Sequence, residues 1–425
     1  MGDVEDDGYE LRPTEFPPEC STANNTIFET VEFLHAYGVI KWPNFTHCLP
    51  HCGSCQPSND DHTYLIYNFM VIGLLLPFIS LCGLFGNGFA AFVYSRPAMR
   101  TSTNLYLCAL GCSDNGVILT ALFLFFLDSI RRYSLKLSII YNMLSPYVYP
   151  VGMIAQTCSV YFTLIAAVDC FIHVCLPDRF RQWFNHPWTI KGLLSFVILF
   201  SILYNLPHCF EGILIECWHT HFNHWAVEVC PAPFRFHPTY VLVYYKYFYS
   251  IFLAVGPLVV LIVLNTCIIL FTMVFKKVEG ESGDNVALIL VVVLFICCNT
   301  VALLINIYEE HLSKLLEARI NYVIDLSNLL VVFNSSFNFI IYYNYSKMFR
   351  RNFKHSVCGR CMSHHHSVLV KTMGEAPNTA LIRTSIHEAG SGEHPACAAL
   401  RFARTESTDS LGPSLRAAAN KEVLI

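Results

Sequence analysis

Amide and carboxyl side chains interrupt long apolar stretches of this chain, and most of them lie near the middle of a stretch. A polar group inside a bilayer is costly, so such groups usually have a functional role. Asp114 is a lone carboxylate at this depth and needs a partner. The polar set consists of Asn87, Asp114, Asn115, Asp169, Asn265, Asn299, Asn334 and Asn338.

Cysteine and histidine residues form a second group, and the run from His47 to Cys55 has the close spacing of a zinc site. Extracellular thiols oxidise and no second ligand cluster is obvious, so the sequence favours disulfides over a metal. We interpret the histidines of 219–224 as a solvated loop for similar reasons. The cysteines on the predicted outer side are Cys20, Cys48, Cys52, Cys55, Cys217 and Cys230.

Seven apolar stretches must position these groups. The chain is 54% hydrophobic and only 14% charged, whereas soluble proteins carry about 25% charged residues. A hydrocarbon core of ~30 Å needs about 20 apolar residues per helix, and backbone groups in lipid must bond within their own segment. The sequence therefore predicts an all-α membrane protein with seven transmembrane helices, at 64–94, 104–128, 145–174, 189–211, 241–275, 285–308 and 318–343.

Basic residues in the loops predict the orientation. They are enriched at 95–103, at 175–191 and after the seventh stretch, which marks the cytoplasmic side, although the loop at 129–144 is also basic. We therefore expect a multi-pass plasma-membrane protein with an extracellular N-terminus. Glycosylation sequons at Asn24 and Asn44 agree with that placement.

Three regions follow from this pattern. Residues 1–63 form an acidic extracellular tail, 64–356 form the membrane domain, and 357–425 form a disordered cytoplasmic tail. The segment 344–356 alternates aromatic and basic residues, which predicts a short amphipathic helix on membrane lipid. Cys358 and Cys361 are either palmitoylated or free thiols, and the hydroxyl cluster at 405–410 is a candidate arrestin site once phosphorylated.

Four motifs occur in register with the spans: Gly86-Asn87, the segment 104–114 that ends in Ser-Asp, Asp169 at the end of the third span, and the segment 334–342. Their order resembles the rhodopsin-type (class A) G-protein-coupled receptors across 64–356. Further strings resemble the invertebrate FMRFamide and myosuppressin-type receptors, namely 101–110, 156–163, 204–207, 298–300 and 334–336. The resemblance implies a short cationic peptide ending in Arg-Phe-amide as ligand and a heterotrimeric G protein as partner. It implies neither an enzyme nor a nucleic-acid partner.

The family pattern also implies a polar core, which is a candidate switch. It places Asp114, Ser159, Asn334, Ser335 and Asn338 around one cavity, with Asn87 adjacent and Asn299 able to face it. Oxygen ligands suit a hard cation, so we predict Na⁺ with water in the resting receptor. The alternative is a protonated Asp114 in a water-bridged network.

Two departures from the family pattern stand at the ends of the third span. Cys170 replaces the arginine that normally follows Asp169, and Ser145 replaces the cysteine that is normally bonded to the outer loop. We predict instead that Cys217 pairs with Cys230, or that one of them pairs with the N-terminal cluster. Either a G protein still couples through the inner residues Asp169, Cys170, Tyr342, Arg179 and Arg350, or the receptor is silent.

Recognition of an Arg-Phe-amide peptide requires a carboxylate for the guanidinium and aromatic rings for the phenyl group. Glu211 is our first choice, because it ends an otherwise apolar span. The other candidates are Glu216, Glu228, Glu309, Glu310, Tyr149, Tyr308, Trp218 and Trp225. The competing functions are a non-peptide chemosensory receptor and a scavenger that binds without signalling. A transporter is disfavoured, because neither inverted repeats nor broken helices are evident.

Overall fold

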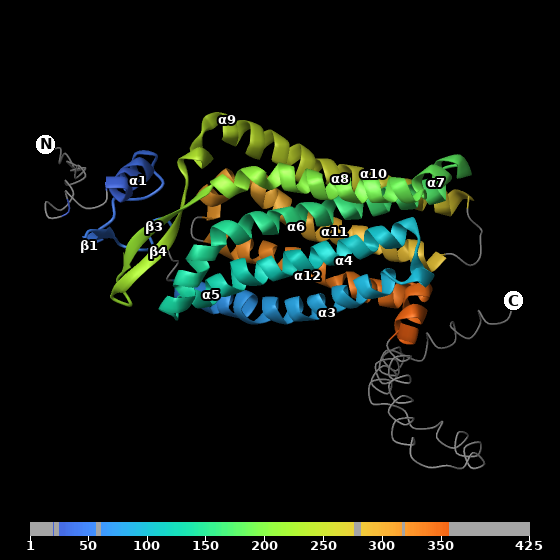
Figure 1. The fold of residues 1–425 in the computed structure, drawn as a ribbon, viewed down its shortest axis with the longest axis horizontal. Helices are drawn as coiled ribbons and strands as arrows, with labels where there is room; N and C mark the ends of the chain where they lie inside the picture. The colour runs from blue at the N-terminus through green and yellow to red at the C-terminus, as the bar shows by residue number, and fades with distance from the viewer. Residues whose placement is uncertain (1–19, 21–24, 57–60, 276–281, 317–318, 357–425) are drawn as a thin grey trace, which may run out of the picture. The chain divides into compact units, whose positions relative to one another are not determined.

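The computed structural model describes residues 20, 25–56, 61–275, 282–316 and 319–356. The chain divides into two units, Met1–Arg350 and Arg351–Ile425, and only 351–356 of the second are described. Within the described residues, seven helices are long and apolar enough to cross a membrane (Figure 1). The predicted all-α bundle of seven spans is confirmed.

Several spans consist of consecutive helical segments. Three of these segments, η2, η4 and η7, are π-helices, whose i→i+5 hydrogen bonds make a wider turn. The third span starts at Leu135 instead of the predicted Ser145. In chain order the spans are α2 (His62–Asn68), η2 (Phe69–Leu75) and α3 (Leu76–Tyr94); α4 (Ser102–Ala121), η4 (Leu122–Phe126) and α5 (Leu127–Arg131); α6 (Leu135–Cys175); α8 (Pro187–Asn205) and η5 (Leu206–Phe210); α9 (Pro238–Tyr240), η7 (Val241–Ala254) and α10 (Val255–Phe275); α11 (Ser282–Leu316); and α12 (Ile320–Tyr345).

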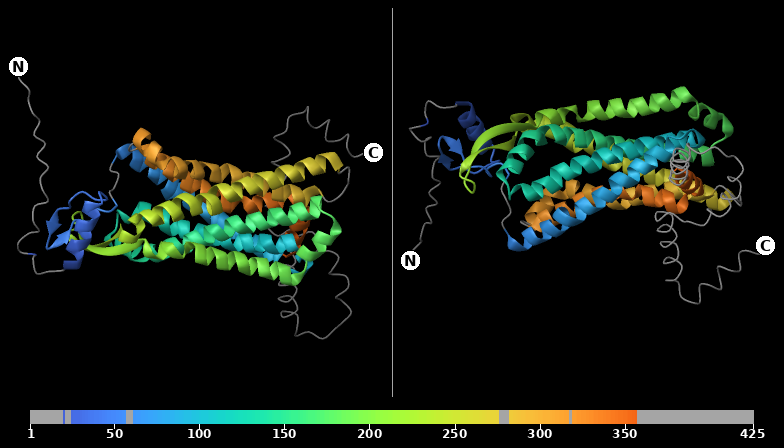
Figure 2. Two further views of the ribbon diagram at one scale, coloured as in Figure 1. Left: turned by 90° about the horizontal axis from the view of Figure 1, so that it is seen from above. Right: turned by 60° about the horizontal axis from the view of Figure 1, so that its bottom comes forward.

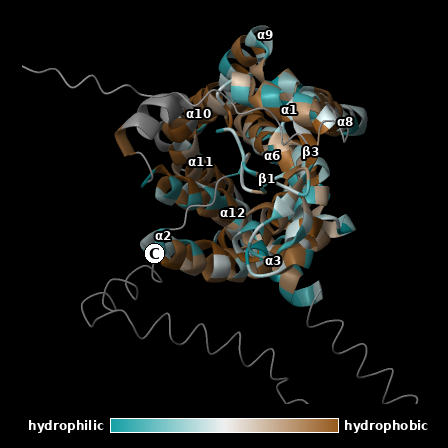
Figure 3. Ribbon diagram, turned by 90° about the vertical axis from the view of Figure 1, so that its left-hand side faces the viewer, coloured by the Kyte–Doolittle hydropathy of each residue, from teal (hydrophilic) through white to brown (hydrophobic). Residues whose placement is uncertain are grey.

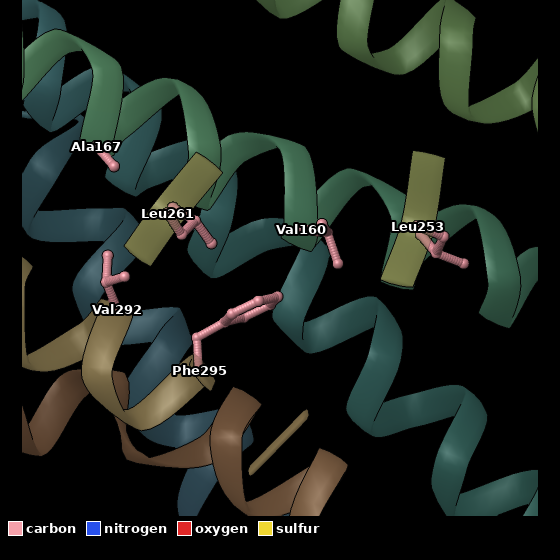
Figure 4. Close-up of a cluster of buried hydrophobic side chains, with 6 residues drawn as sticks. All are labelled: Val160, Ala167, Leu253, Leu261, Val292 and Phe295. Atoms are coloured by element: carbon pink, nitrogen blue, oxygen red, sulfur yellow. The ribbon is translucent and has the colours of Figure 1, made fainter. Parts of the chain in front are cut away.

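An apolar cluster joins the third, fifth and sixth spans. Side chains of α6, η7, α10 and α11 form this cluster, and Figure 2 shows the bundle of spans from two further sides. Its members, drawn in Figure 4, are Val160, Ala167, Leu253, Leu261, Val292 and Phe295. Because lipid tails are as apolar as these side chains, close van der Waals packing at this cluster holds the spans together around the polar core.

Two glycines let α3 approach α12 closely. A Cβ at Gly83 would clash with the Ser336 side chain, and one at Gly86 would lie 2.9 Å from Phe339 Cβ. Contacts this short exclude any larger side chain without a backbone shift. The close approach brings Asn87 within hydrogen-bond distance of α12, where its Nδ2 donates to Ser335 O at 2.8 Å.

An antiparallel hairpin covers the end of the bundle at which α12 begins, which we call the hairpin end (Figure 3). It consists of β3 (Gly212–His219) and β4 (His224–Pro231). Residues 25–56, the N-terminal cap, pack against it with α1 (Asn25–Ala36), β1 (Phe45–Thr46) and β2 (Leu49–Pro50). An apolar cluster forms this contact, with Val31, Leu34, Ile40, Ile215 and Cys230 at its centre.

The disulfides join the cap to the hairpin, so the predicted pairing of Cys217 with Cys230 is wrong and the predicted alternative, a bond to the N-terminal cluster, is the one formed. The hairpin register pairs Cys217 with Ala226 and Cys230 with Ile213. The two cysteines are therefore offset by four residue pairs, ~13 Å along the strands, which is too far for a disulfide. The bonds formed are Cys52–Cys217, Cys55–Cys230 and, within the N-terminal region, Cys20–Cys48.

Short helices lie outside the spans. The loops contain η3 (Pro97–Met99), α7 (Asp178–Phe184) and η6 (Pro233–Phe236). A helix at 347–356 follows α12, as predicted from the amphipathic pattern. Phe349 on this helix is fully buried and packs near Tyr94 and Tyr342, with ring centroids 5.0 and 5.9 Å apart.

Candidate functional site

Glu211 is the buried acid at the hairpin end. The fourth span ends in the short helix η5, and Glu211 follows it directly before β3 begins. Its side chain is only 4% exposed. Its backbone carbonyl accepts from Ala232 N at 2.7 Å, which ties the end of the span to the end of the hairpin.

One oxygen of the Glu211 carboxylate contacts all of the polar side-chain partners that the structure describes for this group. Tyr240 and Tyr245 donate their hydroxyls to Oε1 at 2.5 and 2.7 Å, and His208 Nδ1 lies 3.0 Å from the same atom. The other oxygen, Oε2, is buried and accepts no hydrogen bond from any described residue. A carboxylate in this state has one full oxygen left for a donor from a ligand.

The tyrosines reach Glu211 because of the π geometry of the fifth span. Residues five apart lie about 140° apart around an α-helix, but closer to one face where i→i+5 bonds widen the turn. Tyr240 and Tyr245 are five apart, and η7 starts between them. Tyr244 hydrogen-bonds His208 Nε2 at 3.1 Å, and Tyr149 from α6 packs edge-on against the His208 ring.

We call the residues around this carboxylate, namely His208, Tyr149, Tyr240, Tyr244 and Tyr245, the Glu211 cage. The electrostatics of this cage keep Glu211 ionised. Burial alone would raise the pKa of its carboxyl group. The hydrogen bonds and charge of His208 and the two tyrosine hydroxyls outweigh burial, and they lower the pKa of Glu211 to about 2. Among the described residues, no lysine or arginine lies within ion-pair distance of the carboxylate. The site thus presents an ionised carboxylate that lies beside the His208 imidazole and among aromatic rings.

The other acids singled out in the sequence differ from Glu211. Glu216 is exposed on β3. Glu228 is buried but binds the cap. Its carboxylate accepts hydrogen bonds from the backbone N–H groups of Gly53, Cys55 and Gln56 at 2.8–3.1 Å. Burial raises the pKa of Glu228 despite these bonds. The side chains of Tyr308, Glu309 and Glu310 lie outside the described residues.

The aromatic candidates also divide. Only Tyr149 joins the Glu211 cage, whereas Trp218 packs on His47 of the cap with ring centroids 4.6 Å apart. Trp225 lies opposite Trp218 in the hairpin register and is 39% exposed. Of the predicted modification sites, Asn44 is exposed, while Asn24, Cys358 and Cys361 lie outside the described residues.

Asp114 lies at the centre of the bundle, fully buried. Ser159 Oγ donates to its Oδ1 at 2.7 Å, and Asn338 Nδ2 donates to its Oδ2 at 2.7 Å. Ser335 and Asn87 extend this network through α12 and α3. Three spans are therefore joined through a single carboxylate.

Two predicted members stay outside this network. Asn299 donates to Phe295 O of its own helix at 2.9 Å, and Asn334 forms no hydrogen bond with Asp114 among the described residues. The oxygen atoms of this network fit a hard cation. The buried Asn87 Oδ1 and Asn338 Oδ1 accept no hydrogen bond from described residues, so both are available as ligands.

Asp169 anchors the other end of α6. It is fully buried, and Ser102 and Thr103 at the start of α4 donate to its Oδ2 at 2.9 and 2.5 Å. His173 Nδ1 lies 3.6 Å from Oδ1. Cys170 is buried beside it, so the residue that replaces the family's arginine does not extend into solvent.

The remaining residues predicted at this end differ in exposure. Tyr342 is buried against Tyr94, whereas Arg179 on α7 is exposed. Arg350 donates to the carbonyl of Asn344 at 3.1 Å, near the end of α12.

Sequence reasoning missed the partners of Glu211 and Asp169, whereas it did predict Ser159 and Asn338 beside Asp114. The tyrosine-rich run 240–249 was the signal for the Glu211 cage, but an α-helical period does not align Tyr240 with Tyr245. Ser102, Thr103 and His173 gave no signal as partners of Asp169.

Comparisons with known proteins agree with this arrangement. The profile of the family "7 transmembrane receptor (rhodopsin family)" matches residues 86–342. The chain is 42% identical over 326 residues to the probable G-protein coupled receptor frpr-1 of Caenorhabditis elegans, covering 72% of this chain and 85% of that protein. It is 30% identical to the FMRFamide receptor of Drosophila melanogaster, over 67% of this chain and 53% of that receptor. It is 29% identical to the FMRFamide peptide receptor frpr-18 of Caenorhabditis elegans, over 64% and 66%.

Proposed function

We propose that this chain, which belongs to the rhodopsin family of seven-transmembrane receptors, binds a short peptide that ends in Arg-Phe-amide. The observation that carries the proposal is the Glu211 carboxylate, buried at the hairpin end with one oxygen free of any described partner. The similarity to receptors named for FMRFamide supports the same ligand class.

The chemistry of the cage matches a guanidinium group. Arginine presents a planar fork of charged N–H donors that can bind a free carboxylate oxygen, and its flat face packs on aromatic rings. Glu211 offers the unbonded Oε2, and Tyr149 and Tyr245 supply rings around it. The neighbouring Phe210 and Phe234, with ring centroids 6.4 Å apart, are apolar surface for a phenyl side chain.

The proposal requires the hairpin end to face the exterior of the plasma membrane. Three disulfides at this end support it, because such bonds persist in oxidising surroundings. The basic residues at the opposite end also support it under the positive-inside rule.

We further propose that the receptor couples to a G protein without the usual arginine. Cys170 cannot supply that charge, but Asp169 remains tied to α4 by Ser102 and Thr103. Exposed Arg179 provides positive charge at the same end. Ligand binding then has to favour the conformation in which this end accepts the G protein.

The experiment that tests the ligand class varies the peptide on the unmodified receptor. Cells expressing the receptor are exposed to FMRFamide, to its free-acid form and to its arginine-to-citrulline analogue, with calcium and cAMP readouts and with binding measured in membranes. Citrulline keeps the shape of arginine and removes its charge, so we expect roughly a 10- to 150-fold loss of affinity. Equal affinity for the arginine and citrulline peptides would refute the guanidinium site.

We also propose that Na⁺ occupies the Asp114 network of the resting receptor, held by Asp114, Ser159 and the free amide oxygens. Replacing Na⁺ by N-methylglucamine should then raise agonist affinity, because the ion and the agonist favour different states. Asp114→Asn should remove this sensitivity. Agonist affinity that is equally indifferent to Na⁺ in the unmodified receptor and in Asp114→Asn would contradict the ion and favour a protonated Asp114.

A further inference from the structure

A second buried acid lies at the hairpin end, on a different flank of the bundle. Asp325 is in the first turns of α12, where α2 and η2 pack against that helix. Figure 3 shows α2 beside α12 at this end, with α8 and α9 on the other flank. The Asp325 side chain is 9% exposed, so it is largely removed from water but still reachable.

The described partners of Asp325 are neutral, and they use only one oxygen. Tyr64 OH and Asn68 Nδ2 donate to Oδ2 at 3.1 and 2.9 Å. Nothing described donates to Oδ1. Ser129 holds the amide in place by donating to Asn68 Oδ1 at 2.6 Å. Three side chains from two other spans thus fix the orientation of this carboxylate.

The surroundings of Asp325 suit a cation. Tyr322 packs against Tyr64 and Tyr67 with ring centroids 5.3 and 4.8 Å away, so aromatic faces line one side. Among the described residues no lysine or arginine lies within ion-pair distance of Asp325, and Arg132 acts on its charge only at longer range. A carboxylate at this depth without a cationic partner is costly, and a ligand cation over aromatic rings relieves that cost.

We propose that Asp325 binds the amino-terminal ammonium group of the peptide ligand, as a subsite separate from Glu211. The inference rests on the proposed function, because it assumes a peptide that bears a guanidinium near one end. An extended chain spans ~3.3–3.6 Å per residue, so a peptide of a few residues can reach from one flank of the bundle toward the other. The compact ammonium, with three donors, fits the single free oxygen and the tyrosine rings.

The alternative role of Asp325 is a structural tie between α2 and α12. Asparagine in its place still offers an oxygen to Tyr64 and Asn68, so Asp325→Asn keeps the tie while it removes the charge. The two roles therefore predict different results for this variant.

The test measures the binding of two peptides to the full-length receptor in membranes, FMRFamide and a version extended by three residues at its amino end. Each peptide is compared with its des-amino analogue, in which hydrogen replaces the ammonium. For at least one length, the unmodified receptor should bind the des-amino form roughly 10- to 100-fold more weakly. In Asp325→Asn that difference should shrink to within about threefold.

Asp128→Asn is the matched control, because it removes a nearby negative charge that is half-exposed and already paired with Arg131. This variant should keep the preference for the free ammonium. Equal affinity of the free and des-amino forms at both lengths would overturn the inference and leave the Glu211 site standing. A preference that survives in Asp325→Asn would assign the ammonium to another residue. If neither FMRFamide nor its extended form binds the unmodified receptor, the proposed function fails and the inference fails with it.

Discussion

Replacing Glu211 by lysine is expected to abolish peptide-evoked signalling at concentrations that saturate the unmodified receptor. The variant places a cation among Tyr240, Tyr245 and His208, where the ligand's guanidinium should sit. Like charges in a desolvated site, together with the loss of a buried pair, cost about 3–5 kcal/mol, or roughly a 150- to 5,000-fold loss of affinity. Radioligand binding and a calcium readout measure this loss.

Glu211→Gln separates charge from shape. Glutamine keeps an acceptor for both tyrosine hydroxyls, so the cage should survive while the affinity for an arginine peptide falls roughly 10- to 150-fold. The citrulline peptide should bind Glu211→Gln and the unmodified receptor about equally, which identifies the pair that is lost. Glu216→Lys is the control for charge on the same segment, because Glu216 is exposed on β3. Undiminished potency of the arginine peptide at Glu211→Lys would remove Glu211 from the ligand site.

Lowering the pH should not weaken peptide binding through Glu211 in the way that these variants do. The pKa of Glu211 is lowered to about 2, so any stability that its charge contributes is present above the unfolded-state value of 4.5 and is lost only as the pH falls toward 2. Between about pH 5.5 and 7.5 the carboxylate stays ionised in the unmodified receptor. Any loss of binding in that range must then come from another group, which comparison with Glu211→Gln would show.

The sequence was sufficient to predict the seven-helix bundle, because the apolar composition of each span predicts a membrane helix on its own. About 20 apolar residues in a row predict a helix whatever its neighbours do, and the boundaries differ most for α6, which continues through Pro146 and Pro150. Spacing within a family motif also placed Asp114 near Asn338, and their side chains are in hydrogen-bond contact. Both inferences depend on local patterns.

The rest of the site depends on geometry that no local pattern records. Tyr240 and Tyr245 converge on Glu211 only because η7 is a π-helix, and an α-helical reading of the same residues separates them. The pairing of Cys217 depends on the hairpin register and on the position of the cap, neither of which follows from cysteine spacing. Asp325 was overlooked because its partner Asn68 lies 257 residues earlier in the chain.

Removing the two disulfides between cap and hairpin is the second change with a large expected effect. The bonds Cys52–Cys217 and Cys55–Cys230 tie residues 165 and 175 positions apart. Glu228 adds a non-covalent tie beside them by accepting three backbone N–H groups of the cap. Without the covalent bonds, the apolar contact around Ile215 must hold the cap alone.

The variant Cys52→Ser/Cys217→Ser/Cys55→Ser/Cys230→Ser should therefore lose about 2–4 kcal/mol of cap stability per bond. Because β3 begins at Gly212, directly after Glu211, a loosened hairpin should also weaken peptide binding by at least about tenfold. Thermal unfolding of purified receptor and limited proteolysis of 25–56 measure the first effect, and peptide binding measures the second. Cys20→Ser/Cys48→Ser is the control, since it breaks a bond that does not reach the hairpin. Peptide mapping of the unmodified receptor without reduction should recover Cys52 linked to Cys217, and a Cys217–Cys230 product would contradict the pairing and the role of the cap together.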